Sequence, residues 1–500
     1  MEKLFKVIFF NILFDNMNKS SQWNSVVTFV VAMVGLTIGI GNIWRFSYVL
    51  YSNGGGSFFI PYFIAIAVMG IPFLILEYGL GFSLKKSFSK LMYDIKPEFE
   101  VIAWMLVLLV FIVVIYYMVI LSWDLIYFIN SFNFGWGADT ASFFTNNVGG
   151  SSTFNSSVTI IIPTFIAIIF LWIIFWFISN HDVDDGIGKI SRVLMPLLFI
   201  IMVFIFIYSF TLPNFHLGIS ALLKPNWNML LDIRIWLAAF AQIIFTLSIG
   251  QAMVYTYATY LPKNSRLIDD VLMVVTTNSI YEIFIAFGVF SVLGYMSIKS
   301  GVPINELITD GSGLIFVVFP QIFNSMGFVG HIIGPLLFLS ILFAGITSAF
   351  ALFEPLLSSI LDKFNLSRKK GVTILSIVAC LCSLLFATSI GSCLLGLVDS
   401  FVNEFGILIL IGVQSIIFAW FYGVEKVIPV LNELSTFKVG KKWVFTLKYI
   451  LPIIIIVIWV YGVIELFSEA TLLEVIVDLV ITFAVLGLSI FFTKLSLASD

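Results

Sequence analysis

Oxygen- and amide-bearing residues interrupt the first long apolar segment of the chain. Three glycines, a threonine and an asparagine lie between Gly35 and Asn42. A helix that spans a membrane must satisfy its own backbone hydrogen bonds, and freed backbone groups occur at membrane depth only where they line a cavity. The composition therefore predicts a break in this helix, whose free carbonyls and N–H groups bind an ion or a small solute near the middle of the membrane.

The sixth apolar segment carries a similar interruption. Thr246, Ser248, Gly250 and Gln251 bring hydroxyls, a glycine and an amide into the middle of a span. Interrupted segments at corresponding places in two halves of a chain are the best sequence indication of a transporter's binding site. The N–H end of a broken helix attracts a carboxylate and the C=O end attracts a cation. For either segment alone, a glycine-rich packing face is the alternative explanation.

The composition sets the fold class. The chain has 500 residues, of which 60% are hydrophobic and 11% charged, whereas a soluble domain carries about 25% charge. We expect an all-α polytopic membrane protein with about 12 spans of ~20 residues each. The three cysteines are interpreted as apolar packing residues. The predicted units are a cytoplasmic segment 1–23, a first repeat 24–211, a second repeat 236–422 and two further helices in 444–494.

Lysine and arginine predict the orientation. They cluster in alternate loops, for example at 85–96, 363–370 and 438–448, whereas the opposite loops hold only Lys224, Arg234 and Lys299. This bias predicts that both termini are cytoplasmic in a multi-pass protein of the cell membrane. The expected partners are the lipid bilayer and a small molecule, not a nucleic acid, and a homodimer is one possible assembly.

Charged residues inside the spans are candidates for function, because a charge at the centre of a span costs roughly 2.5–3.5 kcal/mol. Arg45 and Asp399 could form a pair that opens and closes, or a static ion pair. Glu77 could accept backbone N–H bonds from the broken first helix. Glu282 could be a fixed charge beside a cation, a proton carrier or a plain helix–helix contact.

These features together resemble the neurotransmitter:sodium symporter family, whose structural type is the bacterial leucine transporter. The resemblance extends over about residues 20–425 and implies a leucine-transporter fold, with a five-plus-five inverted repeat and broken helices 1 and 6. The motifs that carry it are 39–46, 53–56, 60–62, 242–248 and 343–348, together with Tyr116-Tyr117, Ser122-Trp123, and Asn278 with Glu282.

The resemblance implies two sodium sites. The first comprises the Thr37 carbonyl, the side chains of Asn42, Thr246 and Asn278, and the carboxylate of the substrate itself. The second comprises the carbonyls of Gly35, Ile38 and Ala344 and the hydroxyls of Thr347 and Ser348. Because the substrate would ligate one sodium ion, the binding of either would strengthen the binding of the other.

The resemblance also implies a solute pocket and two gates. Gly39 stands where monoamine carriers of the family have an aspartate, which favours an amino acid as substrate. The expected substrate contacts include Ile40. They are Gly41 and Tyr117 for the carboxylate, Phe245, Thr246 and Ser248 for the amino group, and Val113, Phe245, Gln251, Ser348 and Leu352 for the side chain. The expected gating residues are Phe245 as a lid, Arg45, Gln242 and Asp399 outside, and Tyr260, Asp362 and Trp23 inside.

The chain departs from the family pattern at three informative places. Gln251 replaces an aromatic residue, so the pocket is more polar or differently shaped. Ser20 replaces the arginine that usually pairs with the inner-gate aspartate, and Lys19 is a candidate substitute. Glu282 occupies the place of a small polar residue in chloride-dependent members, which predicts chloride independence because a negative charge is already present.

The sequence therefore favours a sodium-coupled amino-acid symporter over three other classes. A channel would need a continuous polar stripe, whereas the polar groups here cluster at one depth. A membrane enzyme is disfavoured because His181, His216 and His331 are scattered and form no catalytic spacing. A binding sensor without transport remains an alternative.

Overall fold

The computed structural model describes residues 26–154, 158–181, 184–307, 313–468 and 471–495. Within them the secondary structure is helical, apart from one isolated bridge between Ile160 and Thr388. The fold is therefore the all-α class that the composition predicts. Trp23, Ser20 and Lys19, which the sequence singles out, lie outside the described residues.

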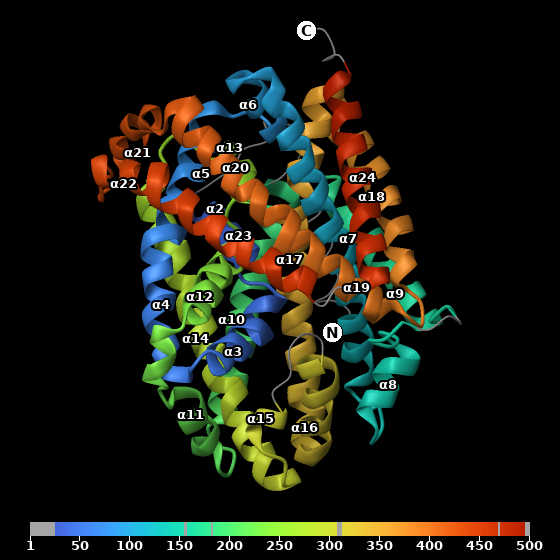
Figure 1. Cartoon of the computed structure of the whole chain (residues 1–500). Coiled ribbons are helices and arrows are strands. Elements are labelled where there is room, and N and C mark those ends of the chain that lie inside the picture. Colours follow the sequence, from blue (N-terminus) through green and yellow to red (C-terminus); the bar gives the residue numbers. More distant parts are fainter. Residues whose placement is uncertain (1–25, 155–157, 182–183, 308–312, 469–470, 496–500) are drawn as a thin grey trace.

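Two of the apolar segments contain a change of helix (Figure 1). In the first, α2 (Val26–Thr37) ends and α3 (Ile40–Ser52) begins after Gly39, whose backbone is extended. In the other, α12 (Ile233–Thr246) is followed by α13 (Met253–Thr259), and left-handed backbone at Ser248, Gly250 and Ala252 separates them. Only glycine adopts such a conformation at no cost, which explains Gly250.

The remaining helices form the bundle around these two pairs. The most enclosed spans are Pro97–Asn130, which contains α7, and Leu314–Phe364, which contains α17. The most apolar stretch of each is 83% and 78% buried, compared with 17% for α24. The helices are α4 (Phe59–Ala65), α5 (Ile71–Leu84), α6 (Phe88–Ile95), α7 (Glu100–Asn130), α8 (Thr140–Asn147), α9 (Ile162–Ser179), α10 (Lys189–Ser209), α11 (Phe215–Leu223), α14 (Leu267–Ser300), α15 (Ile304–Leu307), α16 (Phe319–Met326), α17 (Gly330–Phe364), α18 (Arg368–Ser383), α19 (Gly391–Ser400), α20 (Leu408–Ile416), α21 (Ile428–Leu434), α22 (Lys441–Phe445), α23 (Leu451–Ser468) and α24 (Leu472–Lys494).

Among the described residues, ten helices are long and apolar enough to cross a membrane, or up to eleven if one bent pair counts as a span. The first apolar segment is not among these helices, because α2 ends after 12 described residues. The expected number of about 12 spans and the inverted repeat stay predictions.

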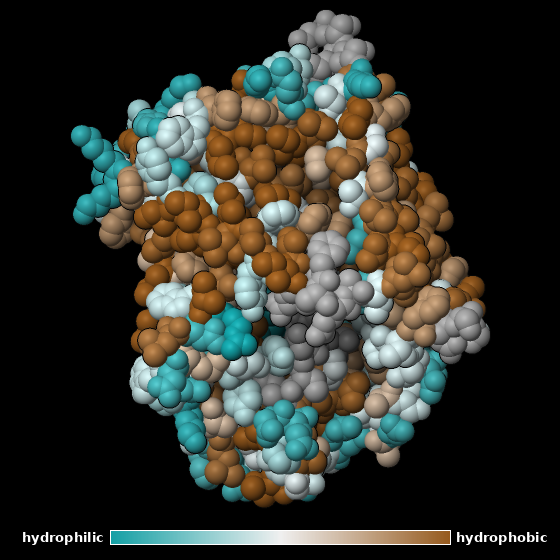
Figure 2. Space-filling view, viewed as in Figure 1, coloured by the Kyte–Doolittle hydropathy of each residue, from teal (hydrophilic) through white to brown (hydrophobic). Residues whose placement is uncertain are grey.

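The two ends of the bundle differ in composition. We call the end that carries α6, α21 and α22 the lysine-rich end (at the top of Figure 1); α8, α11, α15 and α16 lie at the opposite end. Apolar side chains cover much of the visible flank between these ends (Figure 2). The described residues of the segments 131–157, 212–235 and 298–330, which connect longer helices, contain several short helices.

Glycine permits a close contact between α17 and α7. A Cβ atom at Gly345 of α17 would lie 2.1 Å from a methyl group of Leu121 of α7. Small residues allow helix backbones to approach in membranes, where dispersion contacts rather than water exclusion hold helices together. This contact seats the Thr347–Ser348 turn of α17 against the interior of the bundle.

Candidate functional site

A cavity of about 200 Å³ lies beside the two helix changes. Its walls come from α2, α3, α7, α12, α13, α17 and α19, together with Gly39, the segment between α12 and α13, and Asn403 just beyond α19. The side chain of Ile40 lies outside the described set, and the predicted site residues on the wall are Thr37, Gly39, Gly41, Asn42, Arg45, Val113, Tyr117, Gln242, Phe245, Thr246, Ser248, Gln251, Ser348, Leu352 and Asp399. Sequence reasoning missed the wall residues Leu36, Tyr116, Ile120, Met253 and Asn403.

One cluster of oxygen atoms joins α17 to the end of α2. The Thr347 Oγ1 lies 2.8 Å from the Ala344 carbonyl oxygen and 3.1 Å from that of Gly35. The Ser348 Oγ lies 3.1 Å from each of these carbonyl oxygens and 3.4 Å from that of Ile38. The predicted ligands of the second sodium site are thus in mutual contact, and both hydroxyls are buried. Hard cations prefer such oxygen ligands.

The second cluster is centred on Asn42, the third residue of α3. Its Nδ2 lies 3.0 Å from Thr246 Oγ1 and 3.0 Å from Asn278 Oδ1, and Asn278 Nδ2 donates to Thr246 at 2.8 Å. The Asn42 Oδ1 accepts the Gly39 N–H at 2.8 Å, which caps α3. The structure therefore brings together the three side chains predicted for the first sodium site, with Thr37 on the adjoining cavity wall.

Glu282 of α14 lies directly behind this cluster and is fully buried. A buried carboxylate needs hydrogen-bond donors to offset its lost hydration. Sequence reasoning did not connect Tyr62 of α4 to this group, because the two residues are 220 positions apart. The donors are Thr246 Oγ1 (2.6 Å), Tyr62 Oη (2.7 Å), Gln242 Nε2 (3.0 Å) and Asn42 Nδ2 (3.3 Å).

Glu77 supports the other helix change. We expected it to bind the break in the first helix, but its carboxylate accepts the N–H of Gly250, between α12 and α13, at 3.2 Å. The reason is the packing of α5 against α13, which carries Glu77 to that segment. On the other side of the same residue, Gln414 of α20 donates to the Gly250 carbonyl. Gln414 was missed because a single amide in an apolar run gives no distinctive pattern.

The proposed outer-gate residues line the cavity but are not paired with one another. The Arg45 guanidinium lies over the Phe245 ring, 4.2 Å from its centre, a favourable cation–π contact. Asp399 accepts a hydrogen bond from Asn403 Nδ2 at 2.8 Å. Within the described residues no ion pair joins Arg45 and Asp399, so their role as a gate stays a prediction.

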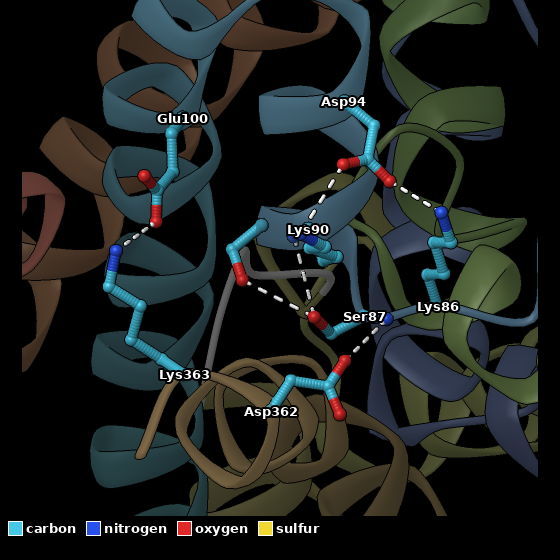
Figure 3. Close-up of polar contacts among 8 residues, drawn as sticks. Lys86, Ser87, Lys90, Asp94, Glu100, Asp362 and Lys363 are labelled. Atoms are coloured by element: carbon cyan, nitrogen blue, oxygen red, sulfur yellow. Dashed lines mark hydrogen bonds and ion pairs between the residues drawn. The ribbon is translucent and has the colours of Figure 1, made fainter. Parts of the chain in front are cut away.

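The proposed inner-gate residues belong to two networks near the lysine-rich end. Tyr260 donates to Glu354 at 3.2 Å, and Arg368 holds the same carboxylate through two bonds of 2.6 and 3.0 Å. Asp362 accepts the N–H of Ser87, the residue that caps α6, at 2.9 Å (Figure 3). Sequence reasoning missed the Glu354–Arg368 pair.

Beside Asp362, Lys363 makes a second contact at the same level of the bundle. Its ammonium pairs with Glu100 of α7 at 2.8 Å, and both side chains are buried (Figure 3). Removing one partner of such a pair leaves an uncompensated charge and is strongly destabilising. One turn of α17 thus ties together α6 and the start of α7.

Comparison with known proteins identifies the family of this chain. The model of the sodium:neurotransmitter symporter family matches residues 20–161 and 138–474. The chain belongs to this family. It is similar to an uncharacterized sodium-dependent transporter of Methanocaldococcus jannaschii, with 35% identity over 87% of this chain and 88% of that protein.

Animal transporters are more distant relatives of this symporter-family chain. A sodium-dependent dopamine transporter of Caenorhabditis elegans is 26% identical, over 87% of this chain and 79% of the relative. A sodium- and chloride-dependent GABA transporter 2 of Rattus norvegicus is 27% identical, over 85% and 77%. The family consists of membrane transporters, so this member is a transporter and not an enzyme.

Proposed function

We propose that this protein is a sodium-coupled symporter that carries an amino acid across the cell membrane by alternating access, without chloride. The observation that carries the proposal is the meeting of the Thr347 and Ser348 hydroxyls with carbonyls of α2 and α17, beside a cavity that also holds the Asn42 cluster. Two groups of neutral oxygens next to one solute-sized cavity suit cations bound together with a solute. The names of the relatives support sodium as the cation.

An amino acid fits the environment of Gly39 and Gly41. A Cβ atom at Gly39 would lie 3.2 Å from both Ser348 Oγ and Tyr117 Oη, so a larger side chain there would disturb both. A Cβ atom at Gly41 would meet nothing within 4 Å, so there is room for a carboxylate beside the first turn of α3. Helix N-termini bind anions through their free N–H groups, which favours a carboxylate-bearing solute.

The function is tested with purified protein in proteoliposomes. An inward sodium gradient should drive uptake of the labelled amino acid that stabilises the protein most in a thermal screen, since a bound ligand raises stability by mass action. Replacing external sodium with potassium should remove the uptake. Uptake that ignores sodium would contradict the proposal, and sodium-dependent binding without uptake would identify a sensor instead.

Chloride independence is proposed from Glu282. Its carboxylate supplies a buried negative charge next to the Asn42 cluster, where a bound anion would otherwise be needed to balance cations. Replacing Glu282 with Ser should leave a protein whose uptake requires chloride, measured by exchanging chloride for gluconate. The wild-type protein should be indifferent to that exchange. A Glu282→Ser variant with unchanged ion dependence would show that the charge does not replace an anion.

The orientation is also proposed. Lysine and arginine favour the cytoplasmic side of membrane proteins, so the lysine-rich end, with α6, α21 and α22, faces the cytoplasm. The opposite end, with α8, α11, α15 and α16, then faces outward. This orientation agrees with cytoplasmic termini as predicted from the sequence.

A further inference from the structure

Asp124 of α7 is a buried carboxylate that the sites above do not use. Its side chain is fully buried, and no donor within the described residues reaches either carboxylate oxygen. An ionised carboxylate in that state is very costly, because nothing replaces its lost hydration. Ionisable residues inside membrane spans are functional candidates for this reason.

The position of Asp124 connects it to the cavity. Val113, Tyr117 and Ile120 all line the cavity, and Asp124 continues their spacing of three or four residues along the helix. Residues at such spacing share one face of an α-helix. This spacing places Asp124 on the cavity-facing side of α7. Because α7 starts at the lysine-rich end, Asp124 lies one turn beyond Ile120 toward the opposite end.

No neighbouring element supplies a positive charge to this carboxylate within the described residues. Lys363 and Arg368 are bonded to Glu100 and Glu354 near the lysine-rich end, and His331 contacts the Phe132 carbonyl. One packed helix, α9, carries no ionisable side chain. The other ionisable side chains on the elements packed against α7 are Lys90, Tyr93, Asp94, Glu98, Asp362, Lys369, Lys370, Cys380, Cys382, Cys393, Asp399, Glu404, Glu474, Asp478 and Lys494.

A neutral carboxylic acid fits this position better than an ion. Its O–H is a donor, and a helix can accept a hydrogen bond from a short polar side chain at the carbonyl one turn back. The same helix does so three times nearby. Ser122, Asn130 and Ser131 donate to the carbonyls of Val119 (2.6 Å), Ile126 (2.8 Å) and Phe128 (2.6 Å).

We propose that Asp124 is a proton-binding site, which is neutral in the enclosed state seen here and ionises when a rearrangement of the outward half admits water to it. That rearrangement rests on the proposed alternating access. Protonation then favours the enclosed state of Asp124, and ionisation favours the hydrated one. Donors for the ionised form lie close by in the chain, since the Trp123 indole N–H and the Tyr127 hydroxyl are buried and unbonded among the described residues.

The first test does not depend on transport. Unfolding temperature is measured against pH for purified wild-type protein and for Asp124→Asn, which imitates the neutral acid. The folded wild-type protein holds a proton that the unfolded chain releases, so its stability should fall relative to the variant as pH rises. Asp478→Asn is the comparison variant, because Asp478 is also a buried carboxylate with an unbonded oxygen but lies on the peripheral α24. It should change the stability curve in the same sense, so the two variants are told apart by uptake.

The second test uses sodium-driven uptake at different external pH values. Wild-type and Asp478→Asn protein should show a shared pH dependence that approaches tenfold per unit where a single group titrates, and Asp124→Asn should lose it. Parallel stability curves, or an unchanged pH profile in Asp124→Asn, would overturn the proton site. Absence of sodium-driven uptake in wild type would overturn the proposed function alone. If Asp124→Asn fails to fold, Asp124→Ser replaces it, because its hydroxyl can donate to the same helix.

Discussion

Replacing Thr347 with Val and Ser348 with Ala should sharply weaken sodium binding at the second proposed sodium site. The variant removes both side-chain oxygens of the cluster and leaves only the carbonyls of Gly35, Ile38 and Ala344. An interaction between a polar group and a charge contributes about 1.5–3 kcal/mol, so two lost ligands should lower sodium affinity by about two orders of magnitude or more. Valine keeps the shape of threonine, so the helix packing should survive.

The measurement is the sodium concentration at which amino-acid binding, or thermal stabilisation, is half complete. Ser358→Ala is the control, because this hydroxyl lies in the same helix but donates to the Pro355 carbonyl outside the cluster. We expect the control to match wild type. An unchanged half-saturating sodium concentration in the double variant would exclude these hydroxyls as ligands.

Replacing Asn42 with Ala should weaken the binding of the amino acid. The amide of Asn42 joins Thr246, Asn278 and Glu282 and also caps the first turn of α3. Its loss would leave buried polar groups without partners, at about 1–3 kcal/mol for each. If the substrate carboxylate and Asn42 share one sodium ion, the solute affinity should fall together with the sodium affinity, because coupling between two ligands is reciprocal.

The decisive measurement is amino-acid affinity at several fixed sodium concentrations. Asn130→Ala is a matched control, because the Asn130 amide donates within α7, to the Ile126 carbonyl at 2.8 Å. We expect the Asn42 variant to lose about tenfold or more of its affinity and to gain little of it back with sodium. Normal affinity for the solute would rule out Asn42 as part of a shared site.

Local features of the chain predicted where the helices change. The glycine and polar residues between Gly35 and Asn42 and between Thr246 and Gln251 mark the positions at which α2 and α12 end. Glycine and short polar side chains weaken a helix through nearby backbone effects alone, so a local pattern is enough to mark such positions. The motif resemblance then selected most of the residues that line the cavity, since a motif preserves the identity of neighbours in the chain.

Local sequence patterns do not predict contacts between distant segments. The bonds of Glu282 to Tyr62, of Gln414 to Gly250 and of Arg368 to Glu354 join residues on different helices. The prediction for Glu77 was wrong for the same reason. Only the packing of α5 against α13 decides which of the two helix changes its carboxylate contacts.

The sequence by itself determined the membrane class, the interrupted segments and the family, because these follow from composition and from residues near one another in the chain. Only the tertiary structure decided which oxygen atoms meet, and that Asp124 is enclosed with no donor among the described residues. Apolar spans are interchangeable in hydrophobicity, so their pairing depends on side-chain shape across many helices at once. The sequence of a single segment does not predict how its side chains fit those of other helices.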